Sequence, residues 1–379
     1  MSDANARIRF PNLNALRFFA AVAVILYHIE HKKHAYKLPS SFKNSYFLST
    51  IGPPAVTFFF VLSGFLITYL LVKERDVYSS ISIPRFYGRR VIRILPVYLV
   101  TVVTALFIAP HFKVFHVPKE SETLAAHFWS IVCLCGTFLS NVAVAVYGNL
   151  PCVDQTWSVS VEEQFYLLWP LVLSFLPRRW FVAAMVAIAM LLPCVRYMVT
   201  PHTTVWILLL YNRFGCMALG GLGAMLVMDR PERLFRIITS RWTFITTLVL
   251  TFVVLCFPVY PQKWNLVQPE CYSVLFCILI VNFACGSGVK IPLDGPFLRR
   301  AGDCSYSAYM YHNLIIAFAC NTLLGKAWGG KHMAPAHLDL MLYPFVLGTT
   351  FLISWLSYIL MEQPLLRLKS KLSPIQSSA

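Results

Sequence analysis

The sequence PAVTFFFVLSGFLITYLLV, residues 54–72, contains no charged side chain and decides the class of fold. A helix of about 20 apolar residues is long enough to cross the roughly 30 Å hydrocarbon core of a bilayer. Further apolar runs follow along the whole chain, near residues 15–31, 94–110, 126–147, 157–176, 181–199, 205–228, 242–260, 271–289, 304–325 and 341–361. The pattern predicts an all-α, multi-pass integral membrane protein.

The composition excludes an ordinary soluble protein. The 379 residues are 58% hydrophobic and 13% charged, whereas about 25% of the residues in a typical soluble domain are charged. The net charge of +16 resides mostly in short basic segments between the apolar runs. Such segments orient membrane proteins and contact anionic lipid head groups. We therefore expect the lipid bilayer, and not nucleic acid, to be the partner of this charge.

The distribution of lysine and arginine predicts how the chain is threaded. If the N-terminus is cytoplasmic and all eleven runs cross, the outer segments are the more basic, against the rule that cytoplasmic loops carry the positive charge. The cytoplasmic segments become the more basic ones if the run 126–147 does not cross and is instead a re-entrant or interfacial helix. The run 94–110 is the alternative candidate for the run that does not cross. We therefore predict about ten transmembrane helices with both termini cytoplasmic. They form one transmembrane domain, residues 1–365, and a short cytoplasmic tail, residues 366–379.

Two ionisable side chains lie within the first apolar run, RFFAAVAVILYH, and such residues are functional candidates because burying them in a membrane is costly. Arg17 and His28 are eleven positions apart, so a helix places them within about 20° of one face and about 16 Å apart along its axis. An arginine at the inner mouth suits a phosphate-bearing donor, and a histidine suits proton abstraction. The alternative is an orienting arginine and a structural, hydrogen-bonded histidine.

A second basic cluster, RFYGRRVIRILP, occupies residues 85–96. Arg90 and Arg93 are neighbours on one helix face, and guanidinium groups bind phosphate bidentately. We interpret them as ligands for the phosphates of a cytoplasmic cofactor, or else as an orienting anchor. Ser63 and Gly64, in SGFLIT, are small residues that let a helix or a ligand approach closely, and we assign them to the same cofactor.

Paired carboxylates stand in WSVSVEEQFYLLWP, residues 157–170. Glu162 and Glu163 point about 100° apart on a helix and so cannot do the same work. We expect at least one to pair with a buried base such as His28, or with Arg213, an arginine inside the run 205–228. The later motif SYSAYMYH adds two hydrogen-bonding side chains, so the candidate substrate-binding residues are Arg213, Tyr309 and His312.

Taken together and in this order, the motifs resemble the membrane-bound acyltransferase-3 family of bacterial O-acyltransferases. The resemblance rests on LNALRFFAAVAVILYH, FFFVLSGFLITYLL, FYGRRVIRILPVYL, WSVSVEEQFYLLWP, RFGCMALGGLGA, SYSAYMYH and YILMEQP, which extend over residues 13–364. The family usually opens with an Asp-Gly-Leu-Arg type of turn. Here Asn14 and Ala15 replace the acidic residue and the glycine, while the spacing from arginine to histidine is kept.

The resemblance implies a ten-helix enzyme of the bacterial inner membrane. Such an enzyme moves an acyl group, commonly acetyl, from cytoplasmic acyl-CoA to a hydroxyl of a surface glycan, such as lipopolysaccharide or exopolysaccharide, or of a lipid-linked sugar. It also implies that Arg17 and His28 are essential and that Arg90 and Arg93 serve the acyl-CoA. Larger relatives carry an extracytoplasmic SGNH-type domain, which this sequence lacks, so we expect direct transfer to the final acceptor.

The preferred hypothesis is O-acyl transfer with His28 as general base and Glu162 or Glu163 orienting or stabilising its imidazole. Acyl-CoA is the expected co-substrate, and we expect no metal. One alternative is a proton-coupled secondary transporter or flippase using His28, Glu162 and Arg213, but its two halves would be expected to show matching broken helices. Another is a non-catalytic acyl-CoA-binding or assembly subunit.

Overall fold

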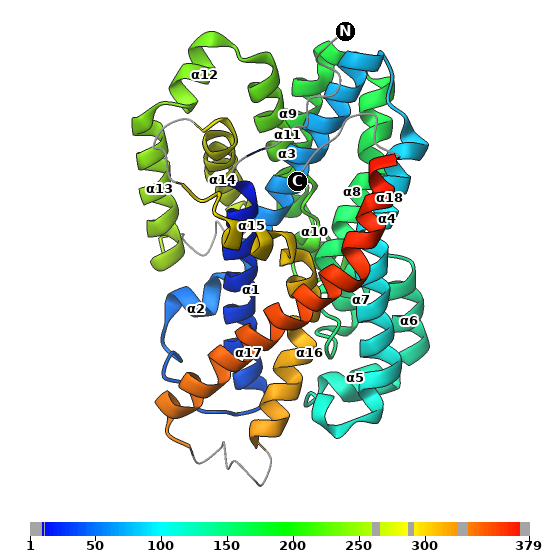
Figure 1. Ribbon diagram of the computed structural model, residues 1–379, viewed down its shortest axis with the longest axis vertical. Coiled ribbons are helices and arrows are strands. Elements are labelled where there is room, and N and C mark those ends of the chain that lie inside the picture. Colours follow the sequence, from blue (N-terminus) through cyan, green and yellow to red (C-terminus); the bar gives the residue numbers. More distant parts are fainter. Residues whose placement is uncertain (1–9, 11, 260–265, 287–291, 325–332, 372–379) are drawn as a thin grey trace.

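The computed structural model describes residues 10, 12–259, 266–286, 292–324 and 333–371. All the regular structure in these ranges is helical (Figure 1), which confirms the predicted all-α class. The first part of the predicted tail forms the end of helix α18 (Gln363–Lys371), and residues 372–379 lie outside the described ranges. The division into a domain of residues 1–365 and a tail stays a prediction.

Long helices form the body of the molecule. Within the described residues, those of 16 residues or more are α1 (Leu13–Ala35), α3 (Gly52–Tyr78), α4 (Ile83–Val103), α8 (Thr156–Phe175), α9 (Phe181–Met198), α11 (Phe214–Asp229), α13 (Arg241–Cys256), α14 (Gln268–Cys285), α16 (Ser305–Leu324) and α17 (Pro335–Ser357). The shorter helices are α2 (Tyr46–Thr50), α5 (Glu120–Ala126), α6 (Phe128–Gly136), α7 (Ser140–Tyr147), α10 (Thr204–Tyr211), α12 (Glu232–Ile238), α15 (Pro296–Asp303) and α18.

Length and apolar content identify the helices that can cross a membrane. In the described part of the chain seven helical segments qualify, or eight if α12 and α13, which meet at 50°, form one broken span. Helices α8 and α16 have 20 residues each but are not among them. Polar side chains lower their hydropathy, among them Glu162 and Gln164 in α8 and His312 and Asn313 in α16. The count of ten spans and the orientation of the termini stay predictions.

The run 126–147, expected not to cross, is divided between short helices. Helices α6 and α7 have nine and eight residues, too few to span a bilayer. The Tyr98 hydroxyl donates to the Cys135 carbonyl at 2.7 Å, which ties α6 to α4. The hydroxyls of Ser140 and Ser160 lie 2.6 Å apart and tie α7 to α8. This segment therefore packs as a short-helix cluster beside two long helices.

The run 205–228, which the sequence presents as a single apolar run, is interrupted at Asn212 and Arg213. Asn212 has an extended backbone, with ψ of 127°, and its side-chain oxygen accepts the backbone N–H of Phe214 at 3.0 Å. An asparagine that bonds to its own backbone two residues on competes with helix continuation. The chain therefore forms α10 and α11 with Arg213 between them.

Many large apolar side chains are exposed on the outside, and several charged or polar side chains are fully buried within the apolar core. Trp242 and Leu360 are both 76% exposed, a position that suits lipid and not water. By contrast, Lys32, Arg196 and His312 have no exposed surface. This arrangement and the set of apolar helices support the coarse prediction of a multi-pass membrane protein.

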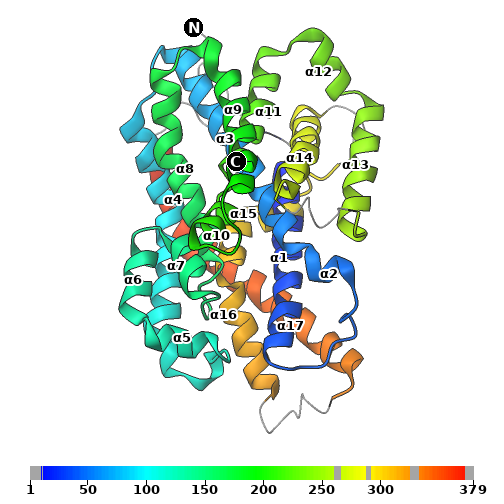
Figure 2. The ribbon, with the colours of Figure 1, turned by 180° about the vertical axis from the view of Figure 1, so that it is seen from behind.

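Helix α1 occupies the middle of the molecule. It contacts α3, α15 and α16. The cluster α4–α8 lies on one side of it and α2 and α12–α14 on the other, as Figures 1 and 2 show from opposite directions. Helices α3 and α11 approach most closely, because a Cβ added at Gly64 or Gly220 would lie 2.0 Å from a backbone oxygen of the other helix. This interface requires glycine at both positions.

Candidate active site

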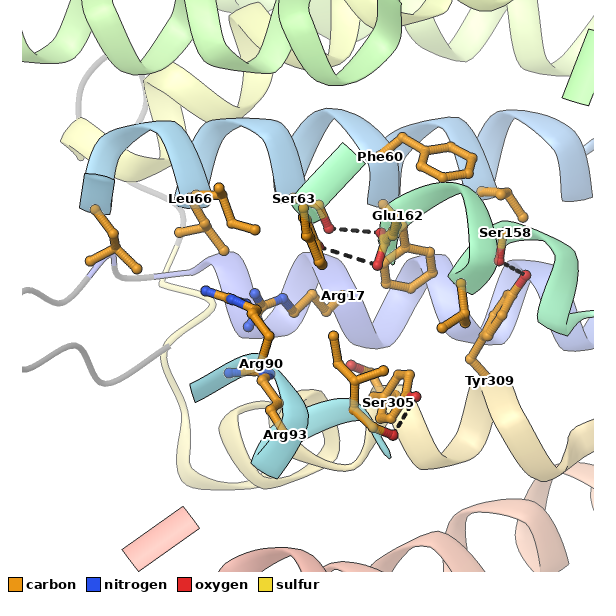
Figure 3. A pocket seen from close by; sticks show the side chains of 18 of the residues that line it. Arg17, Phe60, Ser63, Leu66, Arg90, Arg93, Ser158, Glu162, Ser305 and Tyr309 are labelled. Atoms are coloured by element: carbon orange, nitrogen blue, oxygen red, sulfur yellow. Dashed lines mark hydrogen bonds between the residues drawn. The ribbon is translucent and has the colours of Figure 1, made fainter. Parts of the chain in front are cut away.

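A cavity of about 120 Å³ lies among α1, α3, α4, α8 and α16. Figure 3 shows that its arginines gather at one end, while Ser158 and Tyr309 lie at the other. We call it the arginine-lined cavity. The polar residues in its wall are Arg17, Ser63, Arg90, Arg93, Ser158, Glu162, Tyr166, Ser305, Tyr306 and Tyr309. Most of the cofactor-binding residues predicted from the sequence therefore lie together.

Three guanidinium groups from two helices share the arginine end. Arg17 comes from α1, and Arg90 and Arg93 come from successive turns of α4. The Arg90 guanidinium lies over the rings of Phe86 and Tyr166, 5.5 and 5.4 Å from their centroids, and its Nε is buried without a hydrogen-bond partner among the described residues. Buried cations are costly unless an anion compensates them, and a phosphate would do so.

Asp303, the last residue of α15, is an acidic residue close enough to Arg17 and Arg93 to interact with them electrostatically. Its Oδ1 accepts the Asn14 side-chain N–H at 2.9 Å, which fixes α15 against the start of α1. Partial desolvation raises the pKa of Asp303, whose side chain is still solvent-exposed, and the neighbouring Arg17 and Arg93 oppose that rise. The carboxylate thus offsets part of the positive charge without forming a salt bridge to Arg17 in the described structure.

Glu162 lies in the middle of the arginine-lined cavity and not beside the histidine. Its carboxylate accepts hydrogen bonds from the Ser63 hydroxyl at 2.8 Å and the Tyr166 hydroxyl at 3.3 Å. Glu163 points elsewhere, and its Oε1 is buried without a partner in the described residues. The expected pairing of a glutamate with His28 or Arg213 is therefore wrong for this structure, because the rotation of α8 aims Glu162 at α3.

Ser63 and Gly64, like the two glutamates, are adjacent residues that point in different directions. Ser63 faces the cavity, whereas a Cβ on Gly64 would meet the backbone oxygen of Met217 at 2.0 Å. Adjacent residues on a helix point about 100° apart. The prediction that Gly64 binds the cofactor is therefore corrected: Gly64 lets α11 approach α3, which is the helix-packing alternative for this motif.

Two histidines meet beyond the far end of the cavity. The ring centroids of His28 and His312 are 4.8 Å apart. Each Nδ1 contacts a backbone carbonyl of its own helix, that of Val24 at 2.9 Å and that of Tyr309 at 2.6 Å. A carbonyl only accepts, so each Nδ1 carries the hydrogen and each Nε2 keeps its lone pair. The His312 Nε2 is buried without a partner in the described chain.

Tyr309 connects this histidine pair to the arginine-lined cavity. Its hydroxyl lies 2.6 Å from that of Ser158 at the end of the cavity, and its carbonyl holds the His312 ring one turn along α16. Two of the predicted substrate-binding residues, Tyr309 and His312, therefore stand between the cavity and His28. From the arginine end of the cavity, the hydroxyls of Ser158 and Tyr309 come next, and the imidazoles of His28 and His312 lie beyond them.

Asp154 is a carboxylate near the histidine pair that the sequence motifs did not single out. It accepts the Asn313 side-chain N–H at 2.6 Å and lies 3.7 Å from the Lys32 ammonium. Lys32 follows His28 by one turn of α1 and Asn313 follows His312, so Asp154 is close enough to act electrostatically on His28. Its only signal in the sequence is the polar pair Asp154-Gln155, which Thr156 separates from the WSVSVEEQ motif.

Arg213 lies apart from all these residues. It lines a second cavity of about 720 Å³ together with Arg196, and its Nη1 is buried without a hydrogen-bond partner in the described ranges. Arg196 was not predicted from the sequence, although it is the ionisable residue of the run 181–199. It is fully buried, and its Nη1 donates to both oxygens of Glu270 at 2.9 Å.

The family model for an acyltransferase domain (acyltransferase 3) matches residues 10–359, which include the arginine-lined cavity, the histidine pair and Asp154. The chain belongs to the acyltransferase-3 family. The recognition based on the motifs is thereby confirmed.

Known acyltransferase-3 relatives include bacterial O-acetyltransferases. The O-acetyltransferase OatA of Staphylococcus aureus is 32% identical over 175 residues, which cover 45% of this chain and 26% of the relative. The peptidoglycan O-acetyltransferase OatA of Listeria monocytogenes is 31% identical over 167 residues, 42% of this chain and 23% of the relative. The acyltransferase MdmB of Streptomyces mycarofaciens is 23% identical over 400 residues, 98% of this chain and 95% of the relative. No solved structure matches the chain.

The match covers very different shares of the length of these acyltransferase-3 relatives. The matched segment is about a quarter of each OatA, whereas it is nearly all of MdmB. The family itself is shown over almost the whole chain.

Proposed function

We propose that the protein is an acyl-CoA-dependent O-acyltransferase of the bacterial inner membrane. It moves an acyl group, acetyl in the first instance, from cytoplasmic acyl-CoA to a hydroxyl of a cell-surface glycan or lipid-linked sugar. One observation carries the proposal: the continuous helix α1 bears Arg17 in the arginine-lined cavity and His28 in the histidine pair beyond its far end. A cation site and a base thus lie on one line through the bundle.

The size of the cavity determines which part of the donor it admits. Pockets for drug-sized ligands measure roughly 300–1,000 Å³, and this cavity measures about 120 Å³. The nucleotide phosphates therefore bind at the arginine end, outside the narrow part. The thin pantetheine arm extends past Ser63 and Ser158 and brings the thioester towards Tyr309 and the histidines. Ten spans with both termini cytoplasmic would place the arginine end on the cytoplasmic side.

The His28 Nε2 is the atom that performs the proton transfer. It removes the proton of the acceptor hydroxyl, the oxygen attacks the thioester carbonyl, and the carbon–sulfur bond breaks. The resulting imidazolium returns its proton to the leaving thiolate, so an ester and free CoA are formed. Asp154 stabilises the imidazolium electrostatically, the role first expected of Glu162 or Glu163. Glu162 instead fixes Ser63 and Tyr166 along the path of the donor.

The proposal is tested by the release of free CoA from purified protein in detergent, where no transmembrane gradient exists. We expect CoA release from acetyl-CoA when a glycan acceptor is supplied, with peptidoglycan fragments as the first acceptor because the Listeria relative is a peptidoglycan O-acetyltransferase. Mass spectrometry of surface glycans should show O-acyl groups that disappear when the gene is removed. A strict requirement for a gradient, with unchanged glycans, would favour the transporter hypothesis.

A further inference from the structure

The second cavity lies where α9 ends and where α3, α11 and α14 begin. It shares no lining residue with the arginine-lined cavity and, at about 720 Å³, is several times larger. Its wall includes the aromatic residues Tyr197, Trp206 and Tyr272. A cavity of this size fits a sugar-sized group.

The charges in this wall do not balance. Arg196 is compensated, because Glu270 accepts from its Nη1, while the carbonyls of Leu209 and Asn212 accept from its other nitrogens at 3.0 and 2.8 Å. Arg213 lies near the same carboxylate but forms no salt bridge with it, and its Nη1 is buried and unpartnered among the described residues. One guanidinium charge is therefore left over. A buried donor without a partner is costly, so the site is suited to an anion.

Two further features of the wall favour an anion. The Trp206 indole N–H is also buried without a partner in the described structure, which supplies a second free donor. Three helices begin at the cavity, α3 with 27 residues, α11 with 16 and α14 with 18. The N-terminal end of each helix carries a partial positive charge. Pro53, Pro54 and Pro269 lack an N–H, so these turns contribute mainly their electrostatic field.

Tyr27 links the second cavity to the histidine pair. Gly52 precedes the lining residue Pro53, and it packs so closely on Tyr27 that an added Cβ would lie 2.4 Å from the ring. The Tyr27 and His28 ring centroids are 5.1 Å apart. A molecule held in the cavity would therefore present a hydroxyl to His28 by reaching past Tyr27.

The geometry points to an acceptor subsite that binds an anionic group of the glycan, a phosphate or a sugar carboxylate, through Arg213 and Trp206. This inference rests on the proposed function, since it names the class of acceptor that the transfer uses. Arginine binds both anions through paired N–H donors. The subsite would select charged acceptors over neutral ones of the same shape.

Binding to purified protein in phosphatidylcholine nanodiscs, measured by calorimetry without acyl-CoA, tests the subsite. Two matched pairs of probes separate the sources of the anion: octyl glucuronide against octyl glucoside, and farnesyl monophosphate against farnesol. In at least one pair we expect the anion to bind at least about tenfold more tightly, the effect of roughly one charge-assisted hydrogen bond. Arg213→Gln should abolish that preference, and Arg236→Gln, at an exposed arginine of α12, should preserve it.

Trp206→Phe guards against misfolding as an explanation, because it keeps an aromatic ring in the wall and removes the indole N–H. It should weaken the anionic probe several-fold and leave the neutral one unchanged. Equal binding within both pairs, or a preference that survives Arg213→Gln, would overturn the subsite. Because no donor is present, the outcome is separate from the proposed transfer: loss of CoA release with intact anion preference would overturn the transferase and not the subsite.

Discussion

Arg17 and His28 stand on one helix but in opposite chemical settings. Around Arg17, three guanidinium groups converge on a cavity, and the Arg90 Nε is buried without a hydrogen-bond partner among the described residues. Around His28, two imidazoles are oriented by backbone carbonyls of their own helices, which leaves each Nε2 available, and a carboxylate is nearby. The first setting is built to bind a phosphate and the second to move a proton. Donor affinity and turnover should therefore respond to different substitutions.

The largest difference between the effect on turnover and the effect on donor affinity is expected for His28→Ala. Turnover should fall by roughly 10²–10⁴-fold, the usual effect of losing a positioned general base, while the Kd for acyl-CoA should not change, because Arg17 at the arginine end lies about 16 Å away along α1. Turnover and acyl-CoA binding are measured on the same preparation. His34→Ala, at an exposed histidine of the same helix, is the control. Near-normal turnover would remove the base assignment.

Replacing the arginines should show the reverse effect. Arg90→Ala and Arg93→Ala should each weaken acyl-CoA binding by roughly 10- to 150-fold, the equivalent of about 1.5–3 kcal/mol for a hydrogen bond to a charged group. The rate at saturating donor should be largely retained. Equilibrium binding of acyl-CoA is the measurement, with the exposed Arg233→Ala as control. An unchanged Kd would reduce the cluster to an orienting anchor.

A smaller effect is expected at Gly64, which tests whether its face of α3 packs against α11 while the face of Ser63 lines the cavity. Gly64→Ala should destabilise the protein by about 1–3 kcal/mol, as overpacking does, because the new Cβ would meet the Met217 backbone. Thermal unfolding in detergent is the measurement. Gly136→Ala is the matched control, since its Cβ would meet nothing within 4 Å. Equal stability of the two variants would mean that α3 and α11 are not so closely packed.

The smallest effect is expected for Asp154→Asn. Asparagine can still accept the Asn313 N–H but carries no charge, so we expect turnover to fall about tenfold, or about 1.4 kcal/mol of transition-state stabilisation. The KM for acyl-CoA should be unchanged. This kcat-specific loss distinguishes an electrostatic role from a structural one. If the KM rises as well, Asp154 serves the shape of the donor site and not the histidine.

The sequence was sufficient to predict the residues whose chemistry conflicts with their surroundings. Arg17, Arg90, Arg93 and His28 are ionisable groups in or beside apolar runs, and the helical period alone placed Arg17 and His28 in line. The short helices within the run 126–147 fit the charge distribution, which required that run not to cross. The family resemblance then linked the motifs to one another.

What could not be predicted depends on the rotation and packing of helices. Adjacent residues point about 100° apart, so the sequence did not reveal that Ser63 faces the cavity while Gly64 faces α11, or that Glu162 turns towards α3 and away from His28. Asp154 lies just outside the recognised motif, in a segment whose position is set by contacts with α1 and α16. These placements are tertiary, and no local pattern encodes them.

Photolabelling directly tests the proposed path of the donor from the arginine end to the histidine pair. An acyl-CoA analogue with a diazirine at the end of its acyl chain is bound to the protein, illuminated, and the labelled peptides are mapped by mass spectrometry. We expect labels near Tyr309 and His312 in α16 or near His28 in α1, all removed by excess acetyl-CoA. Competed labels confined to the arginine end, on α4 around Arg90 and Arg93, would show that the acyl group never reaches the histidines and would contradict the proposed path.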